Sequence, residues 1–338
     1  MEQLRGSSWW KATIVCLLIL LYVAPLFVES NMIFRLATIL VSALFATSFN
    51  LLLGYTGLVS FGQAAYYAIG AFTIALFMDA YPSFLLGIMV AAVISGVSAW
   101  VLGSIAFRAS GIYFAILTLA LGELVFQFLY KSSWSGGQNG LAGIKVPDFV
   151  LFDWEIKLNG MPNYYFIILT MVITSLLILW IIVHSRFGKT LVSIKEDPVR
   201  AEFLGVNVRR YRLIAFVISG TFTGIAGALS APLNSIITAD LASWVNSATP
   251  IIITLFGGFS YFFGPAIGAF VYELFRFLTS SFSDSSDLFI GIMLLIVILA
   301  LPNGILGFTA KGKQKANRTK DSAKGANGPK REKKGLSA

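Results

Sequence analysis

The sequence predicts an all-α polytopic membrane protein. Of its 338 residues, 57% are hydrophobic and only 12% are charged. Apolar runs of about 20 residues recur from end to end, and a helix of that length crosses a hydrocarbon core of roughly 30 Å. The runs are continuously apolar rather than alternating, which excludes a transmembrane β-barrel.

Ten apolar runs fit the chain, so we expect about ten transmembrane helices within one transmembrane domain of residues 1–310. Their approximate limits are 12–28, 33–53, 63–78, 83–107, 111–130, 163–184, 211–235, 246–259, 263–279 and 286–301. The first run lacks the small-x-small cleavage site of a secretory signal and is followed closely by more runs, so we interpret it as a retained helix.

The placement of Lys and Arg predicts the orientation. With both termini in the cytoplasm, 20 of the 25 Lys and Arg residues lie on the cytoplasmic side, in agreement with the positive-inside rule. This orientation makes residues 185–210 a cytoplasmic loop and residues 131–162 an extracytoplasmic loop. We therefore expect a multi-pass protein of the cell (inner) membrane.

The C-terminal tail, residues 311–338, carries ten Lys and Arg residues against Asp321 and Glu332, and so accounts for most of the net charge of +9. Its composition is too polar to bury a core, so we expect a disordered cytoplasmic segment that rests against anionic lipid. This interpretation is favoured over nucleic-acid binding.

Two stretches look like nucleotide-binding loops. Trp134–Gly140 reads "WSGGQNG", and Gly307–Lys313 has the outline of a phosphate loop. The first falls in the predicted extracytoplasmic loop, where ATP is absent, and the second has Gln314 where a Mg²⁺-binding hydroxyl is required. With a single Cys16 and no cluster of His or paired acids, we expect no catalytic residues, no metal site and no cofactor.

The cytoplasmic loop 185–210 contains the signals of a short helix. Asp197 suits the N-cap, Pro198 the first helical position and Gly205 a left-handed stop. Val199 and Phe203 then share one face, which gives a small amphipathic helix that stands off the membrane. The alternative is a loop helix packed against its own spans.

This loop resembles the cytoplasmic loop of permease subunits of ATP-binding-cassette (ABC) importers, and among them most the LivM type of branched-chain amino acid permease. The resemblance covers about residues 36–308, in blocks that occur in the order typical of the family. The blocks are Gly54–Gln63, Gly111–Ala115, Leu117–Ala120, Glu123, Gly136–Gly143, Arg186–Gly188, Ile194–Asp197, Ala201–Glu202, Gly205–Asn207, Gly224–Ala228, Gly257–Gly258, Gly264–Pro265 and Pro302–Gly307. Asn303, Pro198 and Arg200 depart from the family pattern.

The resemblance implies a transport subunit without its own ATPase site. Its implied partners are a homologous permease in a heterodimer, two ABC ATPase subunits, and a periplasmic or lipoprotein substrate-binding protein that delivers an amino acid. The implied contacts to the ATPases are Glu196, Asp197, Ala201, Glu202, Phe203 and Gly205. Alternatives are a urea or short-amide permease of the same family, and an ion-coupled carrier or channel.

The expected substrate pathway is a glycine-interrupted stretch together with an acid in the fifth apolar run. Its residues are Gly54, Thr56, Gly57, Ser60, Gly62, Gln63 and Glu123. A helix break at membrane depth is tolerated where it lines a cavity, and a half-helix starting near Ser60 would direct its N–H groups at a carboxylate. The alternatives are a cytoplasmic hairpin turn for 54–63 and a structural polar tie for Glu123. The pairs Gly224/Ala228 and Gly264/Gly268 are interpreted as packing seams.

Overall fold

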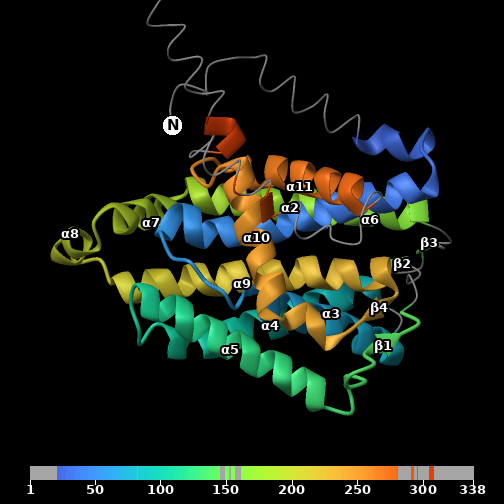
Figure 1. Cartoon of the computed structure of the whole chain (residues 1–338), viewed down its shortest axis with the longest axis horizontal. Helices are drawn as coiled ribbons and strands as arrows, with labels where there is room; N and C mark the ends of the chain where they lie inside the picture. Colours follow the sequence, from blue (N-terminus) through green and yellow to red (C-terminus); the bar gives the residue numbers. More distant parts are fainter. Residues whose placement is uncertain are drawn as a thin grey trace, which may run out of the picture.

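The computed structural model of the chain describes residues 21–81, 83–144, 149–151, 154–156, 161–280, 291–292, 295 and 304–307. Most of the first and tenth expected spans and all of the tail 311–338 lie outside the described residues. A short 3₁₀ helix, η2 (Ala24–Leu26), precedes the first long helix. Figure 1 shows the arrangement.

The other eight apolar runs each form a helix. The helices are α2 (Ser30–Thr56), α3 (Gln63–Ala80), α4 (Phe84–Ala106), α5 (Ile112–Lys131), α6 (Met161–His184), α9 (Val208–Asn234), α10 (Trp244–Gly257) and α11 (Gly264–Ser280). Among the described residues, α2, α4, α5, α6 and α9 are long and apolar enough to cross a membrane. The chain is therefore a helical membrane protein, as its composition predicts.

Helices α10 and α3 are short for membrane-spanning helices. The run 246–259 becomes α10, which has 14 residues and, at 1.5 Å per residue, is about 21 Å long, well short of a bilayer core of roughly 30 Å. Helix α3 has 18 residues, or about 27 Å, and begins inside the bundle. These lengths therefore do not confirm that either run spans the membrane by itself.

Helices α2 and α9 form the centre of the molecule and lie side by side (Figure 1). In both, 67% of the most apolar stretch is buried, against 28% in α5. Helices α3 and α4 pack on α9, α6 and α11 pack on α2, and α10 leans across the front between α11 and α5. The periphery is therefore free to meet lipid or other subunits, whereas α2 and α9 are not.

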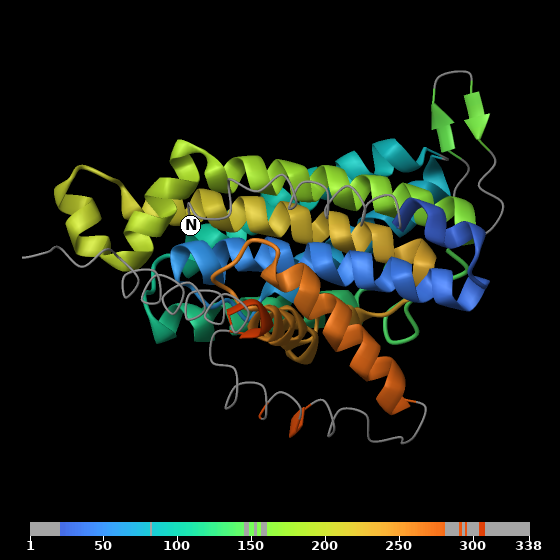
Figure 2. The ribbon, with the colours of Figure 1, turned by 90° about the horizontal axis from the view of Figure 1, so that it is seen from above.

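The two ends of the bundle differ, as Figure 2 shows. One end carries α7 (Arg186–Glu196) and α8 (Pro198–Phe203) and is called the α8 end below. The other carries short strands and is called the β end. The residues 186–212, rich in Lys and Arg, begin at the α8 end, where the link between α4 and α5 also lies.

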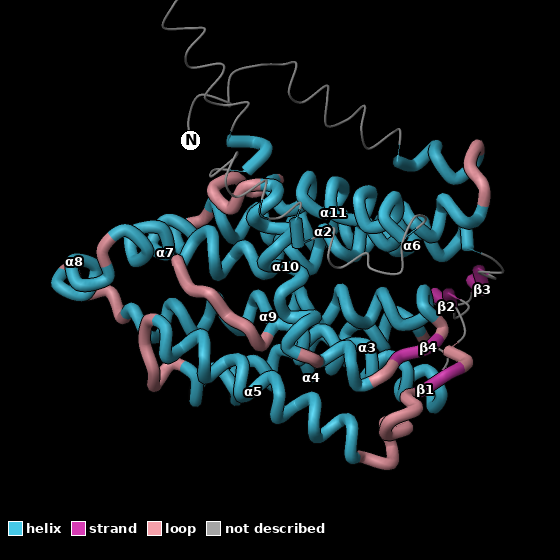
Figure 3. The backbone as a smooth tube through the Cα atoms, in the orientation of Figure 1, coloured by secondary structure: helices cyan, strands magenta, loops and turns pink. Residues whose placement is uncertain are grey.

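The strands are an addition that the sequence analysis does not foresee. β1 (Leu141–Ala142) pairs antiparallel with β4 (Ile236–Ile237), with Leu141 opposite Ile237. β2 (Phe149–Leu151) pairs with β3 (Trp154–Ile156) in a hairpin. As Figure 3 shows, both pairs lie at the β end, and β1–β4 joins the loop after α5 to the segment after α9.

Small residues let the central helices approach backbone to backbone, and the expected glycine seams are confirmed. A side chain at Gly70 of α3 would collide with the carbonyl of Gly224 in α9, and one at Gly224 would collide with Ser95 of α4. Gly264 and Gly268 lie in the same way against the backbone of α10 and its turn. The α3–α9 contact thus depends on the absence of a side chain at Gly70.

We predict that Gly70→Ala lowers the free energy of unfolding by about 1–3 kcal/mol, because the added methyl group forces α3 away from α9. The thermal midpoint of the protein purified in detergent measures this loss. Gly291→Ala is the control, since none of the residues that the structure describes lies within 4 Å of the added Cβ there. Equal midpoints for the two variants would contradict the close packing of α3 on α9.

Candidate functional site

The short helix predicted at 197–205 is present as α8. Asp197 Oδ1 accepts the backbone N–H of Arg200 at 2.9 Å, which makes Asp197 the N-cap, and Pro198 is the first helical residue. Gly205 follows with φ +84°, the left-handed conformation that glycine adopts without strain. The local helix signals read from the sequence are therefore confirmed.

One face of α8 packs on the protein and the other is exposed. Ala201 is buried in a small cluster with Ile194 of α7 and Val208 of α9. On the opposite face Phe203 is 88% exposed and Leu204 is 79% exposed. Of the six residues expected to contact the ATPases, Glu196, Glu202, Phe203 and Gly205 are exposed, Asp197 is half-buried and Ala201 is buried. Each of the two alternatives for this helix therefore describes one of its faces. The face with Ala201 packs against the protein's own helices, and the face with Phe203 is a free apolar surface.

Helix α7 is a feature that the sequence analysis misses. It starts after Ser185 and buries Gly188, Leu191 and Ile194 on one face. That three-residue spacing, directly after a residue suited to the N-cap, is the signal that predicts such a helix. Its strongly amphipathic character suits a helix that lies along the end of the bundle and carries α8.

The pathway stretch begins with a turn at the α8 end. Helix α2 stops at Gly57, whose φ of +72° gives the left-handed C-cap, and the Thr56 hydroxyl donates to the Leu52 carbonyl at 2.8 Å. Lys195 of α7 donates from Nζ to the Gly54 carbonyl at 2.8 Å. This end of α2 therefore meets the helix that carries α8.

Residues 57–62, called the return segment below, then run back into the bundle without helical structure before α3 begins (Figure 1). The two alternatives for 54–63 are thus combined, because a turn at the α8 end is followed by a re-entrant segment. Ser60 and Gln63 are both fully buried. Non-helical backbone among apolar helices requires polar partners from its neighbours.

Three neighbouring helices supply those partners. Thr118 Oγ1 of α5 accepts the N–H of Phe61 at 3.2 Å, and Ser247 Oγ of α10 accepts the N–H of Ala64 at 3.1 Å. From α9, Thr223 donates its hydroxyl to Gln63 Oε1 at 3.3 Å. The start of α3 is therefore held by α5, α9 and α10 at once.

The polar contacts continue from Gln63 into the centre of the bundle. The Thr223 and Ser48 hydroxyls lie 2.8 Å apart, and the Ser219 hydroxyl donates to the Ser48 carbonyl at 2.7 Å. Within the described part of the chain, the buried Gln63 Nε2 has no hydrogen-bond partner. The sequence analysis misses Ser48, Thr118, Thr223 and Ser247, although hydroxyl groups inside apolar runs are the signal that identifies such a network.

Glu123 lies on α5 beside this region. Its Oε1 accepts a hydrogen bond from Gln127 Nε2 at 3.3 Å, and the preceding residue, Gly122, packs against Gly62. Around Glu123 the surface of α5 is open, with Leu124 60% exposed and Phe128 59% exposed. Glu123 itself is half-buried, between this open face and the contact of Gly122 with the return segment.

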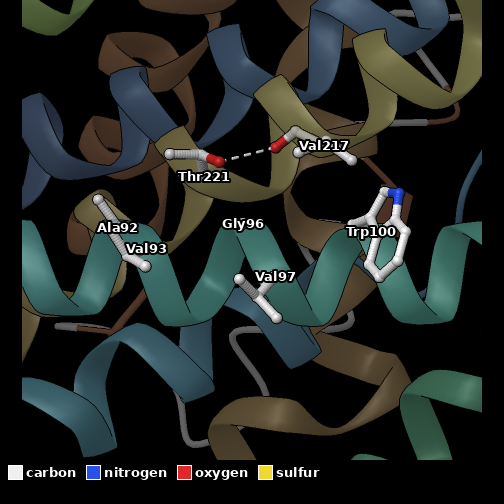
Figure 4. Close-up of a pocket in the computed structure, with 7 residues that line it drawn as sticks. All are labelled: Ala92, Val93, Gly96, Val97, Trp100, Val217 and Thr221. Carbon is white, nitrogen blue, oxygen red and sulfur yellow. Dashed lines mark hydrogen bonds between the residues drawn. The ribbon is translucent and has the colours of Figure 1, made fainter.

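Two hollows of the molecule lie away from the expected pathway residues. One, of about 410 Å³, lies between α4 and α9 and is lined by Trp100, Val217 and Thr221, whose hydroxyl donates to the Val217 carbonyl (Figure 4). A second, of about 690 Å³, lies between α3, α4 and α5. Their walls are almost wholly apolar and contain none of the expected pathway residues, so they suit contact with lipid tails.

The WSGGQNG stretch lies at the β end, opposite α8 (Figure 3). The Ser135 hydroxyl is buried and donates to the carbonyls of Leu129 and Ser132, so the stretch folds as a turn that leads into β1. The Ser135 hydroxyl therefore makes its hydrogen bonds within this part of the chain.

Residues 31–298 of the chain match a known protein family, which is described as branched-chain amino acid transport system / permease component. The chain is 26% identical over 320 residues to the high-affinity branched-chain amino acid transport system permease protein LivM of Escherichia coli (strain K12), covering 88% of this chain and 75% of that protein. No solved structure matches the chain.

Two further relatives broaden the comparison. The LivH permease protein of the high-affinity branched-chain amino acid transport system of Salmonella typhimurium is 24% identical over 286 residues, covering 78% of this chain and 91% of LivH. The nucleoside ABC transporter permease protein NupC of Lactococcus lactis is 27% identical over 193 residues, covering 52% of this chain and 59% of NupC.

Proposed function

The chain belongs to the family of permease components of branched-chain amino acid transport systems, and we propose that it is the membrane permease subunit of an ABC importer for branched-chain or related hydrophobic amino acids. The observation that carries this proposal is the family match over residues 31–298, which includes all five helices long enough to cross a membrane. The resemblance read from the sequence is confirmed by that match and by the LivM relatives.

The assembly we propose contains two homologous permeases, two ATPases and a substrate-binding protein. Relatives named LivM and LivH both match this chain, which supports pairing with a second permease of the same family. ATP hydrolysis then resides in the separate ATPase subunits, and this chain supplies the membrane passage. In this arrangement the α8 end faces the cytoplasm and the β end faces the binding protein.

The ATPases dock on α8 in this proposal. Phe203, Leu204 and Val199 form an exposed apolar surface that water covers in the isolated chain. An apolar patch on a soluble end of a membrane protein is typical of a protein-binding surface. Asp197 and Gly205 define the two ends of the helix, so they fix the direction in which this surface points.

The substrate passes beside the return segment in this proposal. The N-terminus of α3 bears a partial positive charge, and Gln63 Nε2 adds a buried donor without a described partner. Both suit a carboxylate, the group that all amino acids share. Ser60 and Gln63 are closed off in the structure, so access requires α5 or α10 to move.

The open face of α5 suits the second permease and the passage between the two. A carboxylate such as Glu123 is costly in contact with hydrocarbon and lies in membrane helices where it meets water or protein. Its hydrogen bond to Gln127 satisfies one carboxylate oxygen only in part. We therefore assign Glu123 to the passage or its gate, at the boundary with the partner permease.

Uptake by the reconstituted system tests the function. Vesicles that contain both permeases and both ATPases, supplied with the binding protein and a labelled branched-chain amino acid, are expected to accumulate it only with internal ATP. Vanadate is expected to stop uptake, and a protonophore is not. Accumulation by this chain alone, or its loss with the protonophore, would indicate an ion-coupled carrier. Stronger competition by urea or a nucleoside would reassign the substrate.

Docking on α8 predicts that Phe203→Ser greatly reduces co-purification of the ATPases, by about tenfold or more, the scale on which loss of a buried aromatic anchor weakens an interface. The thermal midpoint of the isolated permease should stay unchanged, since Phe203 is exposed. Ile236→Ser, an exposed apolar residue at the β end, is the matched control. Retention of the ATPases by the Phe203 variant would remove α8 from the interface.

Cysteine labelling tests the passage. In a Cys16→Ser background, Glu123→Cys is expected to react with a membrane-impermeant thiol reagent, and added substrate and binding protein should slow the reaction. Trp100→Cys, exposed on the apolar face of α4, is the control and should stay unreactive. If both positions behave alike, Glu123 faces lipid or buried protein, and its assignment to the passage fails.

A further inference from the structure

One lysine of α7 lies where two other segments meet. Lys195 Nζ donates to the Gly54 carbonyl at 2.8 Å and lies 5.2 Å from the ring centroid of Phe259, in the turn after α10. Its stem passes Gly57 so closely that a Cβ there would lie 3.2 Å from Lys195 Cγ. A single side chain therefore contacts the end of α2, the start of the return segment and the turn after α10.

The charge of Lys195 suits this place. Gly54 provides one of the last four carbonyls of α2, which lack partners within the helix, and the C-terminal end of a helix bears a partial negative charge. An ammonium group at these carbonyls donates a hydrogen bond to one of them and also interacts favourably with the negative end of the helix dipole. Burial of the ammonium group lowers the pKa of Lys195, and the neighbouring Glu196 carboxylate acts in the opposite direction.

The two turns that Lys195 touches are also joined to each other. A Cβ on Gly54 would lie 2.5 Å from the Phe259 carbonyl, so the two backbones are in direct contact. Asn50 Nδ2 of α2 donates to the Tyr261 carbonyl at 3.4 Å. A displacement of Lys195 is therefore transmitted to both turns rather than to one.

On its other side Lys195 is tied to α8. Ile194, the preceding residue, is fully buried and packs with Ala201 of α8 and Val208 of α9. Asp197 both ends α7 and caps α8. Movement of α8 therefore tilts the end of α7 that carries Lys195.

Beyond the two turns, the contacts converge again at the start of α3. The return segment leads from Gly57 to Gln63, and α10 leads from its turn back to Ser247. Ser247 Oγ accepts the N–H of Ala64, next to Gln63. The return segment and α10, the two elements that lead away from the contacts of Lys195, thus meet again at the buried polar residues around Gln63.

We propose that Lys195 is the positioning residue through which movement of α8 reaches the return segment and the N-terminus of α10. This inference rests on the proposed function, in which separate ATPases act on α8. Lys195 neither binds the ATPases nor touches substrate. It holds the inner ends of α2 and α10 to α7, so that all three shift together when the ATPases close.

The test measures substrate transported per ATP hydrolysed in vesicles that contain the complete importer. Lys195→Met keeps an apolar stem and removes the charge and the donors, and we expect it to retain the ATPases and their hydrolysis. The transported amount per ATP should fall about fivefold or more, the lower end of typical coupling between sites. Lys195→Arg should restore most of the ratio, and Lys189→Met, on a second exposed lysine of the same helix, should leave it unchanged.

The outcomes separate the proposals. The role of Lys195 is overturned if Lys195→Met transports as much substrate per ATP as the wild type or as Lys189→Met. Loss of the ATPases from Lys195→Met also overturns it, because Lys195 would then be a docking residue. If Lys195→Met does not fold, Lys195→Gln against Lys195→Arg gives the same comparison, because glutamine keeps an N–H donor without the charge. Failure of the wild-type complex to transport with ATP counts against the proposed function instead.

Discussion

The structure depends on one constraint, the need to satisfy the polar backbone of the return segment within an apolar bundle. Six non-helical residues lie between α2 and α3, and the Leu52 carbonyl of α2 accepts the N–H groups of only the first two, Gly57 and Leu58. Each N–H or C=O left unpaired would cost several kcal/mol in hydrocarbon, on the order of a lost hydrogen bond in an apolar medium. Thr118, Ser247 and Thr223 meet part of this need from three different helices. The positions of α5, α9 and α10 around the start of α3 follow from it.

The same constraint explains why small residues concentrate at the centre. Gly62 lies against the Thr118 carbonyl, Gly122 lies against Gly62, and Gly70 lies against Gly224. Backbones that approach this closely keep their polar atoms within reach of one another. The region that the proposed function uses for substrate is therefore closed in this structure, and the parts that border it, α5 and α10, are less buried than the α2–α9 centre.

Much of the fold can be predicted from the sequence, because the length of an apolar run and the capping residues of a helix depend only on residues close together in the chain. Eight expected runs are helices, and Asp197, Pro198 and Gly205 delimit α8 as their chemistry predicts. Other features escape because they depend on contacts between distant segments. The pairing of β1 with β4 joins residues nearly a hundred positions apart, and the partners of Phe61, Gln63 and Ala64 come from three separate helices.

The meeting of the α3 and α10 N-termini has a consequence for ions. Both helices direct the positive end of their dipole toward the region around Ala64 and Ser247. An arrangement that favours an anionic group there disfavours sodium ions and protons, as half-helix dipoles do in water channels. The same helix ends that suit a carboxylate therefore oppose the entry of cations at this point of the bundle.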